Sequence, residues 1–253
     1  MKPPIKLSIE RLTEEPYASI LCYPHANLLE LERRIAELRA LGVDAVEFAG
    51  SGSASNVPVL GKGYVGIVVV AYVHGKRYAL KMRRLDADRA NLTHEAEMLK
   101  KANAVKVGPK FIAVSPNFLL SQLVDGNLLV KWLETHRERF SVRRVLVDIL
   151  EQCWRLDEAG LDHGELSKAP RHLLVDRSDE PFIVDFETAS VTRRVANVTA
   201  VCQYLFAGNS QVPKLVAEVF GEKDRSVMID FLRRYKQNRN RANFEALLQA
   251  CLS

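Results

Sequence analysis

A glycine-rich segment between two candidate strands is the feature of this sequence that most limits its fold. Residues 60–68 fit the pattern G-x-G-x-x-G-x-V, in which Gly61, Gly63 and Gly66 are the three glycines. An apolar run, Ile67 to Val73, follows at once and is typical of a buried strand. Because a Rossmann turn has a helix at this place, we expect a tight turn between two strands of a β-sheet.

The remaining pattern divides the chain into three parts. Residues 1–57 read as an extension of strand, helix and strand, residues 58–125 are rich in strands, and residues 126–253 are mainly helical. Together they predict an α+β protein with a small β-rich lobe and a larger helical lobe. Helices are expected at 28–41, 87–102, 128–138, 142–159, 196–206, 214–219, 224–239 and 243–252, and strands at 19–23, 45–48, 59–60, 67–73, 77–82, 111–114, 118–123, 172–175 and 181–184.

The helix at 28–41 has the clearest local signals. Leu31, Ile35 and Leu38 recur at intervals of three or four and make one apolar face. Asn27 is suited to cap the first turn, and Gly42 is suited to end the last one. Residues 50–58, which read GSGSASNVP, are expected to form a flexible joint after the extension.

A lysine and a glutamate in the strand-rich part form a candidate ion pair. Lys81 ends the apolar strand Y-A-L-K, fifteen residues after Gly66. The following helix offers Glu95 and Glu97 as partners. Glu95 is favoured because Met98 and Leu99, three and four residues later, place it beside the packed face of that helix.

Two loops in the helical part carry the other candidate residues. His163-Gly164-Glu165-Leu166-Ser167 follows a predicted helix, and Asp185-Phe186-Glu187 follows the apolar strand at 181–184. Asp185 is therefore a candidate metal ligand at the end of a strand. Lys168 and Arg171 lie in the loop between the two motifs, and His172 begins the next apolar strand.

Together these motifs resemble the RIO-like atypical Ser/Thr kinases of archaea, in particular a predicted archaeal Ser/Thr kinase group with H-G-E-L-S and D-F-E motifs. The resemblance implies a bilobal protein-kinase-like fold that binds ATP and Mg²⁺. It assigns Gly61, Lys62, Gly63, Gly66, Val68, Lys81 and Glu95 to nucleotide binding, with the Gln122 carbonyl and Val124 N–H facing adenine. Asp185 becomes the metal ligand, Glu165 the base, and Lys168 a cation that neutralises the transferring phosphate.

Two departures from the family pattern concern catalysis. Glu165 stands where the family has an aspartate, so the carboxylate is one methylene further from the backbone. The loop after it is about two residues longer, and His172 takes the place of a metal-binding asparagine. Imidazole suits Mn²⁺ better than Mg²⁺, so His172 is either a metal ligand, with Mn²⁺ as the alternative metal, a phosphate contact or a structural residue.

The amino-acid composition limits which classes of partner and which cell compartment we expect for this protein. A net charge of +5 favours polyanions such as ATP or RNA, and part of the excess lies in a predicted C-terminal helix around 233–241. The longest apolar run is too short to cross a bilayer, and the first residues lack an apolar core, so we expect no secretory signal. Four scattered cysteines indicate free thiols in a reducing, cytoplasmic setting and support neither disulfides nor a zinc site.

Three functions remain open from the sequence. The first is an ATP-dependent phosphotransferase that acts on Ser/Thr hydroxyls of a protein, with the chain itself as one candidate substrate. The second is an ATP-binding switch or slow ATPase that docks on RNA or a ribonucleoprotein through the basic C-terminal helix. The third is a small-molecule kinase of the aminoglycoside or sugar type, which an acidic pocket near Glu165 would favour.

Overall fold

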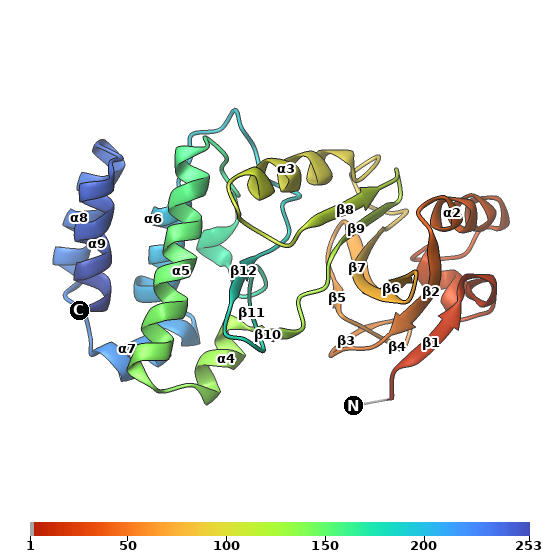
Figure 1. The fold of residues 1–253 in the computed structure, drawn as a ribbon, viewed down its shortest axis with the longest axis horizontal. Helices are drawn as coiled ribbons and strands as arrows, with labels where there is room; N and C mark the ends of the chain where they lie inside the picture. Colours follow the sequence, from red (N-terminus) through yellow and green to blue (C-terminus); the bar gives the residue numbers. More distant parts are fainter. Residues whose placement is uncertain (1–2) are drawn as a thin grey trace. The chain divides into compact units, whose positions relative to one another are not determined.

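The computed structural model describes residues 3–253, except for the side chain of Lys168, and the protein has mixed α and β structure (Figure 1). It consists of two compact units. Unit 1 comprises the described residues up to Glu97 together with Lys110–Leu123, and unit 2 comprises Met98–Pro109 together with Val124–Ser253. The α+β class expected from the sequence is confirmed, and the boundary between the units falls inside one helix, α3 (Thr93–Ala104).

Unit 1 is built on an antiparallel sheet in the order β1-β2-β6-β7-β9-β8, with the short β5 paired to β6. Its strands are β1 (Ile5–Ser8), β2 (Val43–Phe48), β5 (Gly61–Lys62), β6 (Gly66–Val73), β7 (Lys76–Arg83), β8 (Phe111–Val114) and β9 (Phe118–Gln122). A separate pair, β3 (Gly52–Ala54) and β4 (Val57–Val59), precedes the glycine segment. The turn at His74 and Gly75, both with positive φ, closes the β6–β7 hairpin between the two strands expected at 67–73 and 77–82.

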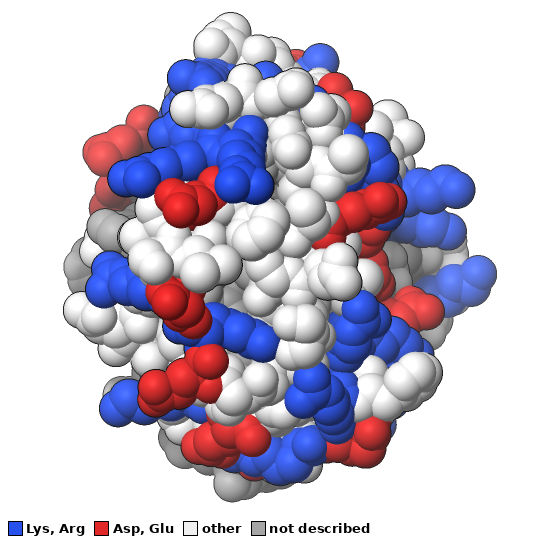
Figure 2. All heavy atoms as spheres, turned by 90° about the vertical axis from the view of Figure 1, so that its left-hand side faces the viewer, with Lys and Arg blue, Asp and Glu red and all other residues white. Residues whose placement is uncertain are grey.

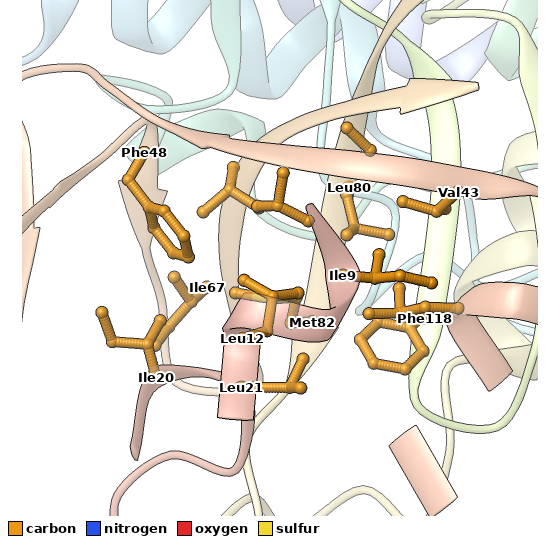
Figure 3. Close-up of a cluster of buried hydrophobic side chains, with 14 of the residues drawn as sticks. Ile9, Leu12, Ile20, Leu21, Val43, Phe48, Ile67, Leu80, Met82 and Phe118 are labelled. Carbon is orange, nitrogen blue, oxygen red and sulfur yellow. The ribbon is translucent and has the colours of Figure 1, made fainter. Parts of the chain in front are cut away.

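One apolar core joins the N-terminal extension to the sheet (Figure 3). Leu12 lies in the 3₁₀ helix η1 (Ile9–Thr13) and Ile20 in α1 (Tyr17–Leu21), and they share this core with Ile67, Leu80 and Phe118 of the sheet. The third element is α2 (Leu28–Ala40), capped by Asn27 as predicted. Each fully buried side chain of this size contributes about 1.5–3 kcal/mol, so residues 3–57 are an integral part of unit 1.

A buried arginine fixes α2 to the strands. Arg34 is fully buried, and its Nη1 donates to the carbonyls of Leu21 at 2.6 Å and Arg83 at 2.7 Å. Its Nε contacts Glu30 at 2.8 Å, and its Nη2 donates to Asn117 Oδ1 at 3.0 Å. These contacts replace the hydrogen bonds with water that the guanidinium loses on burial. A substitution that removes one of its partners should therefore lower the free energy of unfolding.

Unit 2 is mainly helical and carries a three-stranded antiparallel sheet in the order β10-β11-β12. The long helix α5 packs against α6, α7, α9 and β12 and supplies much of the buried apolar surface. The elements are β10 (Gly126–Leu128), α4 (Leu129–Thr135), α5 (Arg139–Glu158), η2 (Leu166–Lys168), β11 (Leu173–Asp176), β12 (Pro181–Ile183), α6 (Asn197–Cys202), a π-helical turn η3 (Gln203–Ala207), α7 (Gln211–Phe220), α8 (Arg225–Gln237) and α9 (Arg241–Leu252).

Four expectations about elements need correction. The flexible joint expected at 50–58 is wrong, because this segment forms the β3–β4 pair, in which Val57 and Val59 are buried. The strand expected at 19–23 is wrong, because Tyr17–Leu21 forms α1. The helix expected from Ala87 begins only at Thr93, whose N–H donates to Asn91 Oδ1 at 3.0 Å. The helix expected from Val142 begins earlier, at Arg139, because the Glu138 carboxylate accepts from the N–H groups of Phe140 and Ser141.

Across residues 3–253, no helix combines the length and the apolar character that a membrane crossing requires. The four cysteines are buried free thiols, as the sequence predicted.

Candidate functional site

The glycine segment forms a tight turn between β5 and β6 in unit 1. Its ends are joined by the Gly63 N–H, which donates to the Gly66 carbonyl at 2.8 Å. A Cβ on Gly66 would lie 2.9 Å from Lys81 Cγ and 2.9 Å from the Met82 carbonyl oxygen. Glycine is thus required at this position because the lysine stem passes directly over the backbone.

Lys81 and Glu95 form the ion pair expected from the sequence. Lys81 lies opposite Val68 in the β6–β7 register, and its Nζ is 2.8 Å from Oε2 of Glu95 in the first turn of α3. Their side chains are 13% and 8% exposed, whereas Glu97 is exposed to solvent. A lysine held by a buried carboxylate beside a glycine turn can offer its charge to a phosphate in a fixed position.

A tyrosine from the N-terminal extension braces the glycine turn, which sequence reasoning missed. The hydroxyl of Tyr23 accepts from Lys62 Nζ at 2.5 Å, and the same ammonium lies 4.2 Å from the ring centroid. Arg84 stacks on this ring at 5.0 Å and donates to the Gly63 carbonyl at 2.7 Å. Tyr23 and Lys62 are 39 residues apart in the sequence, so no local sequence pattern indicates this contact.

The two residues expected to face adenine lie at the end of unit 1 and the start of unit 2. Gln122 is the last residue of β9, and its N–H donates to the Lys110 carbonyl at 2.8 Å. Its Oε1 also accepts from the Lys110 N–H at 3.2 Å. Val124 lies in the irregular segment 123–125, where the chain passes from one unit to the other.

In unit 2, the β11–β12 hairpin brings His172 and Asp185 close together. Leu173 pairs with Ile183, and the Val184 N–H donates to the His172 carbonyl at 2.9 Å. Asp185 follows directly with a φ of 70°, a left-handed conformation that few non-glycine residues adopt. Such backbone strain is common at functional positions, where the surrounding structure holds it in place.

Glu165, His172 and Asp185 form a carboxylate–imidazole cluster. His172 Nε2 is 3.4 Å from Glu165 Oε2, and His172 Nδ1 is 3.8 Å from Asp185 Oδ2. One ligand atom from each residue lies within 4.8 Å of the others, a spacing that could hold a divalent metal ion. The His172 side chain is 11% exposed, while those of Glu165 and Asp185 are 39% and 35% exposed, so the cluster opens to solvent through its carboxylates.

A buried histidine connects the loop of Glu165 to the segment of Asp185. His163 Nε2 is 3.0 Å from the Val184 carbonyl, and the His163 carbonyl accepts from Thr188 Oγ1 at 3.0 Å. Burial lowers the pKa of His163 to about 4, so the ring is neutral at neutral pH. Gly164 has a φ of 90°, and a Cβ there would overlap the guanidinium of Arg193, which itself donates to Asp162 at 2.5 Å.

The lysine predicted to act in the loop cannot be placed. Lys168 is the last residue of η2, and its side chain lies outside the described part of the chain. Its neighbour Arg171 is exposed, one residue before His172.

The basic residues near the C-terminus are interspersed with acidic ones. Figure 2 shows Lys and Arg side chains next to Asp and Glu on the face that carries α8 and α9. Arg241 contacts Glu151 at 2.7 Å, and Arg233 lies 3.5 Å from Asp230. These pairs reduce the free positive charge that the sequence segment 233–241 suggested.

No known protein-family model matches this sequence, and a comparison with curated proteins finds no significant match. The function therefore has to be argued from the geometry and chemistry of the two sets of residues described above.

Proposed function

We propose that the protein is an ATP-dependent phosphotransferase of the RIO-like protein kinase type, which transfers phosphate to Ser/Thr hydroxyls of a protein. In this proposal unit 1 is the small lobe and unit 2 the large lobe of a bilobal kinase-like fold. The ion pair between Lys81 and Glu95 beside Gly66 carries the proposal. A glycine turn followed by a paired lysine is the arrangement that kinases use to hold ATP phosphates.

Each unit supplies a different part of the chemistry. Lys81 would orient the α- and β-phosphates, and the glycine turn would approach them with its N–H groups. Glu165 would accept the proton of the attacking hydroxyl. A divalent cation held by Asp185 would supply the charge that offsets the phosphate oxygens. Phosphoryl transfer depends mainly on such positioning and electrostatics, so an unusual carboxylate is tolerable if it is well held.

The short segment after Asp185 supports a compact, RIO-like enzyme over a eukaryotic-type kinase. Only residues 188–196 separate Glu187 from α6, and they contain no A-P-E triplet. A long activation loop and the peptide-docking platform that it forms have no room there. Regulation by phosphorylation of such a loop is accordingly not part of the proposal.

Incubation with γ-labelled ATP and either Mg²⁺ or Mn²⁺ tests this function. Wild-type protein is compared with Asp185→Ala and Glu165→Gln, and the exposed residues Asp88 and Glu158 provide the matched controls Asp88→Ala and Glu158→Gln. Label on protein that disappears in the first two variants and persists in the controls is the expected result. Wild-type protein that binds ATP without any turnover in either metal would contradict the proposal.

An ATP-binding switch or slow ATPase in ribonucleoprotein assembly is the second candidate. The basic side chains on α8 and α9 favour it, although several are paired with carboxylates. Phosphate release without labelled protein, stimulated by RNA, would distinguish this function in the same assay. A small-molecule kinase would instead label an added aminoglycoside or sugar, and the acidic side chains of the carboxylate–imidazole cluster favour that outcome.

A further inference from the structure

His172 is the least ordinary member of the carboxylate–imidazole cluster. The residue is 9% exposed, and its two ring nitrogens face two different carboxylates. Among the described groups, which do not include the side chain of Lys168, none forms a hydrogen bond with its buried Nδ1 atom. A buried imidazole nitrogen without a hydrogen bond costs free energy unless something else satisfies it.

We propose that Glu165, His172 and Asp185 form a carboxylate–histidine–metal triad for a first-row divalent transition metal such as Mn²⁺. His172 Nδ1 and an Asp185 oxygen bind the ion, while Glu165 accepts from the Nε2–H of His172 and fixes the ring. This inference rests on the proposed function for the role of the metal in phosphate transfer. The binding itself requires no nucleotide, and Glu165 acts in it as a positioning residue.

The distances within the cluster fit this assignment. The 3.8 Å between Nδ1 and Asp185 Oδ2 is well beyond the length of a hydrogen bond, about 2.7–3.2 Å, whereas the 3.4 Å between Nε2 and Glu165 Oε2 exceeds that range only slightly. Two atoms that each lie about 2.1 Å from one metal ion are about 3.0–3.5 Å apart, and further apart at wider angles. The gap between imidazole and carboxylate is therefore close to the width that a bound ion spans.

The second nitrogen determines which tautomer the ring adopts. Nε2 is 3.4 Å from Glu165 Oε2, so a proton on Nε2 faces an acceptor and leaves the Nδ1 lone pair for a ligand. Metal-binding histidines commonly donate their other N–H to a carboxylate, which holds the ring and makes the imidazole a stronger ligand. Because a glutamate side chain is one methylene longer than that of an aspartate, the Glu165 carboxylate can reach the ring of His172 from its own loop.

The nature of the donor atoms determines the metal. Mg²⁺ prefers oxygen ligands in near-octahedral geometry, whereas imidazole nitrogen suits first-row transition metals. In the kinases that this sequence resembles, an asparagine stands where this chain has His172. Replacing an oxygen by a nitrogen at one ligand position moves the preference away from Mg²⁺.

A titration of the full chain with Mn²⁺ and with Mg²⁺, without nucleotide, tests the triad. Free Mn²⁺ is followed by electron paramagnetic resonance, Mg²⁺ binding by calorimetry, and Co²⁺ serves as a spectroscopic probe of nitrogen ligation. We expect one Mn²⁺ per chain, bound at least about tenfold more tightly than Mg²⁺. Equal affinity for the two ions, or no Mn²⁺ binding, would overturn the inference.

Variants separate the ligand from the positioning residue. His172→Ala should abolish the preference for Mn²⁺, and His172→Asn should bring the two affinities together, because it restores an oxygen ligand. Glu165→Ala should weaken Mn²⁺ binding about tenfold or more, while Glu165→Gln should largely rescue it, since an amide oxygen also accepts from Nε2–H. The exposed His25 provides the control His25→Ala, and thermal unfolding of each variant excludes misfolding as a cause.

The results also separate this inference from the proposed function. A Mn²⁺ preference that persists in His172→Ala, or Mn²⁺ binding that is unchanged in Glu165→Ala, contradicts the triad even if the protein transfers phosphate. Tight Mn²⁺ binding that depends on His172 supports the triad even if no labelled protein is ever formed.

Discussion

Two sets of charged side chains, one in each unit, differ in how closely their members are held. In unit 1, Lys81 and Glu95 are in direct contact at 2.8 Å and almost completely buried. In unit 2, the nearest atoms of Glu165, His172 and Asp185 are 3.4 and 3.8 Å apart, and both carboxylates are about one third exposed. In the first set the two charged groups contact each other directly. In the second set the ligand atoms are spaced as they would be around a bound metal ion.

This difference separates binding from catalysis in the proposed enzyme. A pair that is already formed needs no reorganisation when a phosphate arrives, so it should dominate affinity. A cluster whose ligand atoms are spaced to hold an ion should instead govern the rate and the choice of metal. Substitutions in the two units should consequently affect different measurements.

Replacement of Lys81 should have the largest effect. Lys81→Ala removes the cation 2.8 Å from a buried Glu95, so we expect the affinity for ATP, and with it phosphate transfer at low ATP, to fall at least about 100-fold and the free energy of unfolding to fall by about 3 kcal/mol. Radiolabel transfer and urea denaturation measure the two effects. Lys76→Ala, at an exposed position on the same strand, is the control and should change neither. Full activity in Lys81→Ala would show that the ion pair of unit 1 does not hold ATP and would contradict the comparison between the two sets of residues.

Gly164→Ala should destabilise unit 2 through its backbone. The residue has a φ of 90°, and the new Cβ would displace Arg193 from its contacts with Asp162, so we expect a loss of about 2–3 kcal/mol. Gly160→Ala is the matched control, because Gly160 also has positive φ but has open space around its Cβ position, and it should cost about 1 kcal/mol. Chemical denaturation compares the two, and equal losses would show that the contact with Arg193 is unimportant.

The free energy of unfolding should fall at acidic pH because of the buried, neutral His163. Its pKa is about 4 when folded and about 6.5 when unfolded, so the unfolded state binds more protons between these values. Stability should accordingly fall as the pH is lowered from about 6.5 to 4, with a total contribution on the order of 3 kcal/mol. Denaturation at pH 7 and pH 4.5 should show a smaller difference in His163→Gln than in wild type. The exposed His25 supplies the control His25→Gln, which should behave like wild type.

Loss of the Tyr23 hydroxyl should have the smallest effect. Tyr23→Phe removes its hydrogen bond with Lys62 but keeps the ring on which Arg84 stacks. We expect the KM for ATP to rise about threefold with kcat unchanged, since one partly exposed hydrogen bond contributes about 0.5–1 kcal/mol. Steady-state kinetics measure this, with Tyr64→Phe at the exposed tip of the turn as the control. A fall in kcat without a change in KM would assign Tyr23 to another role.

Much of the fold was predictable because its local signals agree with its packing. The cap at Asn27 and the apolar spacing of Leu31, Ile35 and Leu38 gave α2 almost to the residue. The strand expected at 19–23 was wrong because a run of five residues is too short for periodicity to separate a strand from a helix. Arg34 lies on the buried face of α2 together with Leu31 and Leu38, and only distant partners such as Asn117 explain how its charge can be buried there.

The candidate site was predictable in its parts but not in its contacts. The spacing between Gly66 and Lys81 and the position of Glu95 on its helix were sufficient to expect their ion pair. The approach of Glu165 to His172 depends on the path of the loop through η2, which no spacing rule describes for a lengthened loop. The brace formed by Tyr23 depends on the fold of the N-terminal extension and has no local signal.

The strand order of unit 1 has a practical consequence for anyone who shortens this chain. Because β2 lies between β1 and β6, removal of the first fifty or so residues would expose the edge of β6 at residues 70–73, beyond its short pairing with β5. That strand reads GIVVVAYV and carries no charge along its length. An apolar, unprotected edge can pair with the same edge of another molecule. We therefore expect a protein that lacks these residues to aggregate, and the N-terminal extension prevents this by covering the edge of β6.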